Sequence, residues 1–242
     1  MLQRNLGLAL LAVLVAGCTT SKDPEAVAQN DPYESTNRTV FEFNNKVDRN
    51  FAKPVAKFYN HAVPQFARDG LHNFLTNLNK PVTLGDDMLQ ANGPRVGETL
   101  GRIIVNTTLG VGGFIDVATK MGMPDHSEDF GQTLGTWGVG EGPYIVLPLI
   151  GPDPPRDMAG DVVDIFLDPL TYVRFHGSDT WYAVRSATGV LDLRARNIDT
   201  LDQIERSSID FYATTRSLYR QYRAAEIRNG APEQDGTDTP EF

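Results

Sequence analysis

Cysteine is almost absent from this chain, since Cys18 is the only one among 242 residues. Without a second thiol the chain cannot form an internal disulfide, and it cannot build a cysteine-based metal site. His61, His72 and His176 stand alone in the sequence, so they indicate no metal site either. We therefore predict no metal and no cofactor, apart from a covalent lipid if Cys18 carries one.

Long apolar runs and several catalytic signatures are also missing. No segment reaches 18 unbroken apolar residues, so the sequence predicts no helix that crosses a bilayer. It contains no G-x-x-x-x-G-K-[ST] phosphate loop, no G-x-S-x-G elbow and no H-E-x-x-H zinc motif. We therefore predict that the protein is not an enzyme and has no nucleotide energy source of its own.

Basic charge is scarce as well. The formal net charge is −9, which argues against nucleic acid as a partner and against a polybasic contact with anionic headgroups. Two acidic groups resemble sites at first sight. The run 126–129 (HSED) lies on one loop without a nucleophile elbow, and the carboxylates of Asp161, Asp164 and Asp168 fit a solvated helix face better than a metal site.

The N-terminus MLQRNLGLALLAVLVAGCTT has the parts of a bacterial lipoprotein signal. Arg4 supplies a basic start, residues 6–16 an apolar stretch too short to span a bilayer, and residues 15–18 (VAGC) resemble a lipobox. We predict removal of residues 1–17 and acylation of Cys18, which leaves a formal charge of about −10 because Arg4 is lost. The alternative is an ordinary signal peptide or tail anchor with a chance cysteine.

The rest of the chain is predicted to be all-α with a Gly/Pro-rich centre. Residues 18–31 are polar and indicate an acylated tether, residues 32–228 a helical domain, and residues 229–242 a disordered acidic tail. Apolar spacing predicts amphipathic helices that stop at Pro54 and at residues 79–81, a helix opened by Pro94, and one long helix over 201–222. A helical hairpin should turn at residues 110–113.

The segment Tyr144–Ile150 is almost wholly apolar and is bracketed by glycines and prolines. Its sequence fits a core strand, a hinge, or a segment that sits in lipid. As a helix it would cover about 10 Å, enough to enter one leaflet of a bilayer without crossing both.

Three stretches together resemble the MlaA (VacJ) family of outer-membrane phospholipid-binding lipoproteins. They are residues 37–44 (NRTVFEFN), residues 105–118 (VNTTLGVGGFIDVA), and residues 128–131 (EDFG) continuing through 142–157 (GPYIVLPLIGPDPPRD). With Pro64-Gln65, Gly70-Leu71 and Asn73-Phe74 the likeness extends over about residues 31–225. One departure from the family pattern is 153–155 (DPP), where serine and threonine are common.

The resemblance implies a ring-shaped, membrane-embedded bundle of amphipathic helices. It implies a lipid-anchored protein on the periplasmic face of the outer membrane, beside trimeric porins. There an amphipathic pore would take mislocalised phospholipid from the outer leaflet and pass it to a periplasmic carrier of the MlaC type. Two alternatives remain open: a structural lipoprotein that braces porins, and a lipid-anchored envelope hydrolase.

The same resemblance suggests candidate residues for the lipid path or its gate. Phe43 and Asn44 are gating candidates in the first helix, where Phe43 is expected to dock that helix onto the ring. Asn106 and Thr107 fit either a polar pore face or ordinary helix-end hydrogen bonding. The remaining candidates come from the apolar segment, where they are expected to line the pore wall: Tyr144, Leu147 and Leu149.

Overall fold

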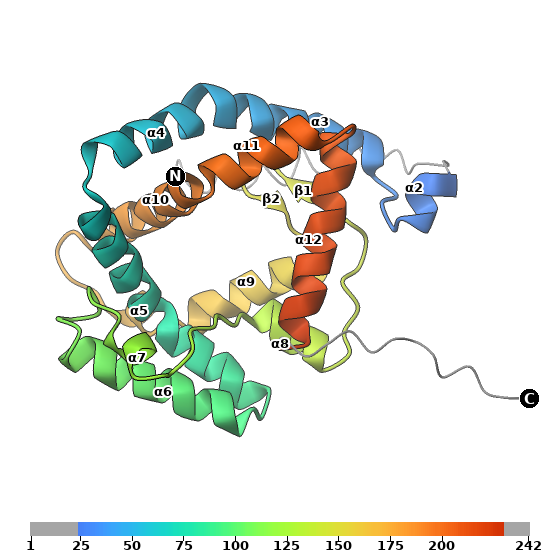
Figure 1. The fold of residues 1–242 in the computed structure, drawn as a ribbon. Helices are drawn as coiled ribbons and strands as arrows, with labels where there is room; N and C mark the ends of the chain where they lie inside the picture. Colours follow the sequence, from blue (N-terminus) through green and yellow to red (C-terminus); the bar gives the residue numbers. More distant parts are fainter. Residues whose placement is uncertain (1–23, 230–242) are drawn as a thin grey trace, which may run out of the picture.

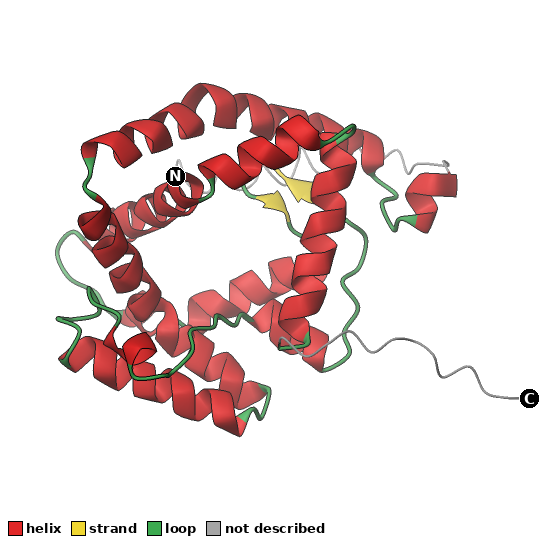
Figure 2. Cartoon of the chain, in the orientation of Figure 1, coloured by secondary structure: helices red, strands yellow, loops and turns green. Residues whose placement is uncertain are grey.

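The structure is a computed structural model that describes residues 24–229. The predicted signal peptide, Cys18 and residues 230–242 of the predicted tail lie outside the described residues. Helices make up most of the described chain (Figure 2), as the sequence predicts. In chain order the elements are α2 (Pro24–Ala28), α3 (Glu34–Val47), the π-helix η1 (Asp48–Ala52), α4 (Lys53–Ala62), α5 (Gln65–Leu89), α6 (Gly93–Thr108), α7 (Val117–Lys120), α8 (Phe130–Thr136), β1 (Val146–Leu147), β2 (Gly151–Pro152), α9 (Pro155–Leu167), the 3-10 helix η2 (Pro169–Tyr172), α10 (Ser178–Arg196), α11 (Ile198–Ser207) and α12 (Phe211–Ile227).

The helices are arranged as a closed ring, which Figure 1 shows from one side. α3, η1 and α4 form one edge, α5 descends from it, and α8, α9 and α12 complete the circuit back to α3. Two sets of polar contacts close the ring between the chain's early and late segments. Arg38 of α3 binds Asp210 at 2.7 Å, and Arg216 of α12 binds Asp31 at 2.6 Å.

The first edge of the ring continues through Pro54, where the sequence predicts a break. Pro54 is the second residue of α4, which directly follows the π-helical turn η1, at whose end the N–H of Lys53 donates to the carbonyl of Asp48. The π-helical turn η1 joins α3 to α4 without interrupting the helical path. Ion pairs hold this junction against the next layer, with Arg194 on Asp48 at 2.6 Å and Lys53 on Asp202 at 2.7 Å.

Two other predicted helix boundaries are wrong. α5 runs through Pro81 to Leu89, because the turns after the proline carry buried side chains with partners on other elements. Asp87, for example, accepts a hydrogen bond from Thr99 of α6 at 2.6 Å. The long C-terminal helix is instead two helices, since Asp210 accepts from the N–H of Ala213 and so caps the start of α12.

The predicted turn at residues 110–113 is present, and it leads into the short helix α7. The predicted tether is ordered in its second half, because Pro24–Ala28 form α2 and both Ala26 and Asp31 are buried. At the other end Asn229 is held by Gln90 at 3.2 Å, so the described domain extends one residue beyond the predicted boundary.

The distribution of buried and exposed side chains is the reverse of that in a water-soluble domain. Among the described residues, 19 polar or charged side chains are buried against 10 apolar ones, while 33 large apolar side chains are exposed. Soluble monomers bury most of their large apolar residues and expose only limited apolar patches. No described helix is both long and apolar enough to cross a membrane. The ring is therefore held together mainly by polar contacts and leaves many of its large apolar side chains exposed.

Candidate functional site: adjoining cavities and a clamped hairpin

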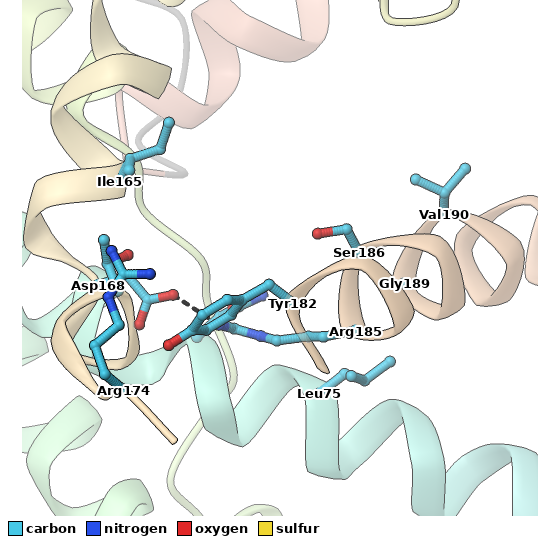
Figure 3. A pocket seen from close by; sticks show the side chains of 11 residues that line it. Leu75, Ile165, Asp168, Arg174, Tyr182, Arg185, Ser186, Gly189 and Val190 are labelled. Atoms are coloured by element: carbon cyan, nitrogen blue, oxygen red, sulfur yellow. Dashed lines mark hydrogen bonds and ion pairs between the residues drawn. The ribbon is translucent and has the colours of Figure 1, made fainter. Parts of the chain in front are cut away.

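Three adjoining cavities follow the inner elements of the ring. The first, which we call the basic cavity, has a volume of about 660 Å³ and lies between α5, α9, η2 and α10 (Figure 3). The second, the acidic cavity, measures about 620 Å³ and shares Asn79, Ile165, Asp168 and Thr171 with the first. The third, of about 270 Å³, shares Ser127, Glu128, Gln132 and Glu226 with the second. Because each cavity shares lining residues with the next, the three cavities lie next to one another.

The basic cavity combines apolar walls with two arginines. Leu75, Ile165 and Val190 line it from three different helices, and Arg174 and Arg185 stand at the end next to Asp168 (Figure 3). Arg185 is neutralised by Asp168 at 2.7 Å. Arg174 has only a long contact of 3.9 Å to Asp179, and its side chain is 74% exposed. This cavity therefore offers apolar surface together with one poorly neutralised cation.

The acidic cavity is lined by six carboxylates and by no arginine, lysine or histidine among the described residues. Four of the six are paired with arginines that lie behind them. Arg223 binds Asp129 at 2.7 Å and Glu226 at 3.0 Å, Arg185 binds Asp168, and Arg95 binds Glu128. The other two carboxylates belong to Asp161 and Asp164, and no described cation pairs with them.

Burial and neighbouring charges shift the pKa values of these carboxyl groups in different directions. Desolvation raises the pKa of Asp164 to about 6, and it also raises the pKa of Asp161. Desolvation acts on Asp129 too, but the hydrogen bonds and charge of Arg223 outweigh it and lower the pKa of that carboxyl. The two unpaired carboxylates thus lie in a region of excess negative potential, where a cation would be favoured.

The wall behind the acidic cavity contains Asp86, which is fully buried. Desolvation and the nearby charge of Asp164 raise its pKa to about 7, from 3.8 in an unfolded chain, although Thr133 donates a hydrogen bond to it at 2.9 Å. Because the folded state holds the proton more tightly, this group favours folding below pH 4 and loses that contribution as the pH rises to 7.

Asp86→Asn is therefore expected to stabilise the protein at pH 8, by at most about 4 kcal/mol, with a gain that shrinks as the pH falls toward 4. Chemical unfolding of the purified protein at pH 8 and pH 5 measures both values. Asp199→Asn, on an exposed turn of α11, is the matched control. Equal effects of Asp86→Asn at the two pH values would contradict the assignment.

The apolar segment of the sequence forms a small hairpin that α3 clamps. β1 pairs antiparallel with β2, Val146 opposite Pro152 and Leu147 opposite Gly151. Asn37 accepts from the N–H of Val146 at 3.0 Å and donates to the carbonyl of Tyr144 at 2.9 Å. One heptad later along α3, Asn44 accepts from the N–H of Leu149 at 2.7 Å and donates to the carbonyl of Leu147 at 2.9 Å.

The hairpin therefore has a buried base and an exposed tip. Tyr144 and Val146 are fully buried and belong to a core cluster with Phe41 and Tyr212. Leu149, in left-handed backbone conformation with φ of 66°, is 70% exposed, and its neighbour Ile150 is exposed as well. The segment is thus a core strand at one end and an exposed apolar tip at the other, and the helical alternative is wrong.

The structure separates the residues that the sequence analysis grouped as lipid-path candidates. Phe43 is half-exposed and Phe41 takes the buried position, so Asn44 rather than Phe43 docks α3. Asn106 is buried, and its amide oxygen accepts from the N–H groups of Val117 and Ala118 at the start of α7, which matches the helix-end interpretation. Thr107 is exposed and accepts from Asn77 at 3.0 Å.

None of the seven candidates of the described chain lines any of the three cavities. The cavity residues come from elements far apart in the sequence, and the basic residues Arg174 and Arg185 stand in no motif. Two groups of cavity residues had a visible signal in the sequence: the run 126–129 (HSED), which was interpreted as a loop without a nucleophile elbow, and the spacing of Asp161, Asp164 and Asp168, which was interpreted as a solvated helix face. No three metal-ligating side chains in the described part of the chain lie close enough together to hold a metal ion.

The fold is a helical ring that buries polar side chains at its helix contacts and exposes many large apolar ones, as surfaces that meet a membrane or another protein do. Comparison with known proteins identifies the family. The family model for the MlaA lipoprotein matches residues 29–226, and the chain belongs to that family.

Individual relatives agree with this assignment. The chain is 37% identical over 232 residues to the intermembrane phospholipid transport system lipoprotein MlaA of Escherichia coli K12, covering 94% of this chain and 89% of that one. It is 34% identical to the lipoprotein of the same name from Haemophilus influenzae, over 91% of this chain and 89% of that one. A solved structure concerned with the maintenance of bacterial outer-membrane lipid asymmetry superposes with a TM-score of 0.73 at 35% identity, covering 81% of this chain and 98% of that one.

Proposed function

We propose that this protein is an outer-membrane lipoprotein that removes mislocalised phospholipid from the outer leaflet. It takes the lipid through an amphipathic path in the ring and passes it to a periplasmic carrier of the MlaC type, which maintains lipid asymmetry. Trimeric porins are its partners in the membrane, and Cys18 carries the acyl anchor. The names of its relatives, which refer to phospholipid transport and outer-membrane lipid asymmetry, support this function.

The observation that carries the proposal is the set of adjoining cavities with apolar and charged walls in a ring that exposes many large apolar side chains. Exposing the roughly 30 methylenes of two acyl chains to water would cost about 24 kcal/mol, at about 0.8 kcal/mol each. A passive conduit lowers that barrier only if it covers the chains and also gives the headgroup a polar route. The basic cavity places apolar and charged walls side by side, which is the combination that such a conduit needs.

The decisive experiment deletes the gene and measures phospholipid in the outer leaflet. Phospholipid should accumulate there, and the intact gene should restore the normal level. Cys18→Ser should fail to restore it although the ring residues are unchanged, because the anchor is lost and a single missing acylation site removes stable membrane attachment. Membrane fractionation and palmitate labelling report whether the variant protein is anchored.

Two results would contradict the proposal. Normal outer-leaflet phospholipid in the deletion strain would remove the transport function and favour a porin brace. Full complementation by an unlabelled Cys18→Ser protein would show that the anchor is not needed. Hydrolysis of phospholipid by the purified protein would favour the third possibility, an anchored envelope hydrolase.

A further inference from the structure

The two large cavities differ sharply in charge although they share a wall. The basic cavity holds the exposed guanidinium of Arg174 beside apolar side chains, and the acidic cavity holds two carboxylates that no described cation pairs. Asn79, Ile165, Asp168 and Thr171 line both, so the two cavities lie next to each other. A ligand that reaches from one to the other and matches both carries an anionic group and a cationic group a few bonds apart.

A second, independent observation points to a hydrogen-bond donor in the acidic cavity. Gln132 lines this cavity and is 2% exposed. Its Nε2 donates to Asp129 at 3.0 Å, but its Oε1 has no hydrogen-bond partner. A buried acceptor without a donor is unfavourable, so a ligand that brings an N–H group to this wall is favoured.

The composition of the acidic cavity selects among cations. A metal ion is disfavoured, because no three described carboxylates lie close enough together to share one. Quaternary ammonium groups are commonly held by aromatic side chains, and none of the described residues lining this cavity is aromatic. A primary ammonium, in contrast, donates three hydrogen bonds and suits separated carboxylate and amide oxygens.

We propose that the acidic cavity binds the primary ammonium of an ethanolamine-type phospholipid headgroup through Asp161, Asp164 and Gln132, while the lipid phosphate lies at Arg174. The proposal rests on the phospholipid transport function and adds a headgroup preference to it. The acyl chains then follow the apolar wall of the basic cavity, formed by Leu75, Ile165 and Val190. Phosphatidylglycerol, which is anionic and has no ammonium, is repelled by the same carboxylates.

The test is lipid competition with the full-length acylated protein in detergent micelles. The micelles contain equal amounts of dioleoyl phosphatidylethanolamine, phosphatidylcholine and phosphatidylglycerol, which share their acyl chains. Mass spectrometry of the repurified protein gives the total lipid bound and the ratio of the three. We expect at least a threefold enrichment of the ethanolamine lipid over each of the others, and excess free ethanolamine should reduce its bound fraction if the ammonium alone is recognised.

Asp161→Asn is the diagnostic variant, because Asp161 is exposed and makes no ion pair or hydrogen bond with another described residue whose loss would disturb folding. It should bring the ethanolamine-to-choline ratio close to one while total lipid stays unchanged. Asp199→Asn removes the same charge outside the cavities and should keep the wild-type ratio. Lipid bound in proportion to its abundance, or an unchanged ratio in Asp161→Asn, overturns the headgroup preference alone. A wild-type protein that binds no lipid instead overturns the transport function.

Discussion

Arg223→Ala should lower the free energy of unfolding by about 3–5 kcal/mol, because it leaves buried carboxylates without their cation. Arg223 is itself buried and joins α12 to two other elements. It binds Asp129 at the start of α8 at 2.7 Å and Asp157 of α9 at 2.9 Å. Hydrogen bonds to Arg223 contribute to lowering the pKa of both carboxyl groups, so each is ionised in the folded protein at neutral pH.

The pH dependence of this effect identifies its cause. A carboxyl group with a lowered folded pKa stabilises the fold above its unfolded pKa, and that stabilisation is lost as the pH falls through the folded value. The difference between wild type and Arg223→Ala should therefore be largest near pH 7 and shrink below about pH 4, where the carboxylates are protonated. Chemical unfolding of the purified proteins gives both values.

Arg206→Ala is the matched control, since Arg206 is exposed in the last turn of α11. It should change the free energy of unfolding by less than about 0.5 kcal/mol. An equal decrease in the free energy of unfolding in the two variants, or a decrease in Arg223→Ala that does not depend on pH, would show that the ion pairs of Arg223 do not hold the ring closed.

Deletion of Phe43 and Asn44 should make the protein leak phospholipid instead of merely inactivating it. The deletion removes Asn44, one of the two asparagines through which α3 binds the hairpin, so the carbonyl of Leu147 and the N–H of Leu149 lose their hydrogen-bond partners. It also rotates the following residues by about 200° relative to Asn37, at about 100° per residue. A passive path has no built-in direction, so an unclamped hairpin leaves it open to the prevailing gradient.

Such a leak should be dominant, because an open path acts whether or not a normal copy is present. Expression of the deletion beside the intact gene, followed by measurement of outer-leaflet phospholipid, tests this. Asn44→Ala should reproduce part of the leak, whereas Phe43→Ala should behave nearly as wild type, since Phe43 is half-exposed. A recessive phenotype identical to that of the gene deletion would remove the gating role of Asn44.

The sequence predicted the all-helical class and several helix starts, because apolar periodicity and proline position are local signals. Pro94 does open α6 as expected. Pro81 was interpreted as a stop, yet its cost is offset by tertiary contacts of the turns beyond it, which no local pattern reveals. The break before α12 was missed because the helical spacing of Ile204, Ser208 and Phe211 continues across it, although Asp210 was available as a cap.

The candidate site was less predictable than the fold. The apolar periodicity predicted that Phe43 lies on the buried side of α3. In this protein many large apolar side chains are exposed, and Phe43 is one of them. Asn44 was correctly singled out, and its role came into view only with the hairpin that it binds, more than a hundred residues away. The cavities remained hidden, since Arg174, Asp161 and Gln132 converge only through the path of the chain.

The closure of the ring also determines when it can form. Arg216 and Asp31 are 185 residues apart, and Tyr212 and Asp31 are 181 residues apart, so the last contacts join almost the two ends of the described chain. Contacts at such separation form slowly, because the entropy of a long loop must be lost before they contribute. Until α12 emerges and docks, the partly folded chain exposes both its apolar outer face and its unpaired interior charges to water. The ring can therefore close only after the last helix has been synthesised, and until then the open chain exposes apolar surface that favours aggregation.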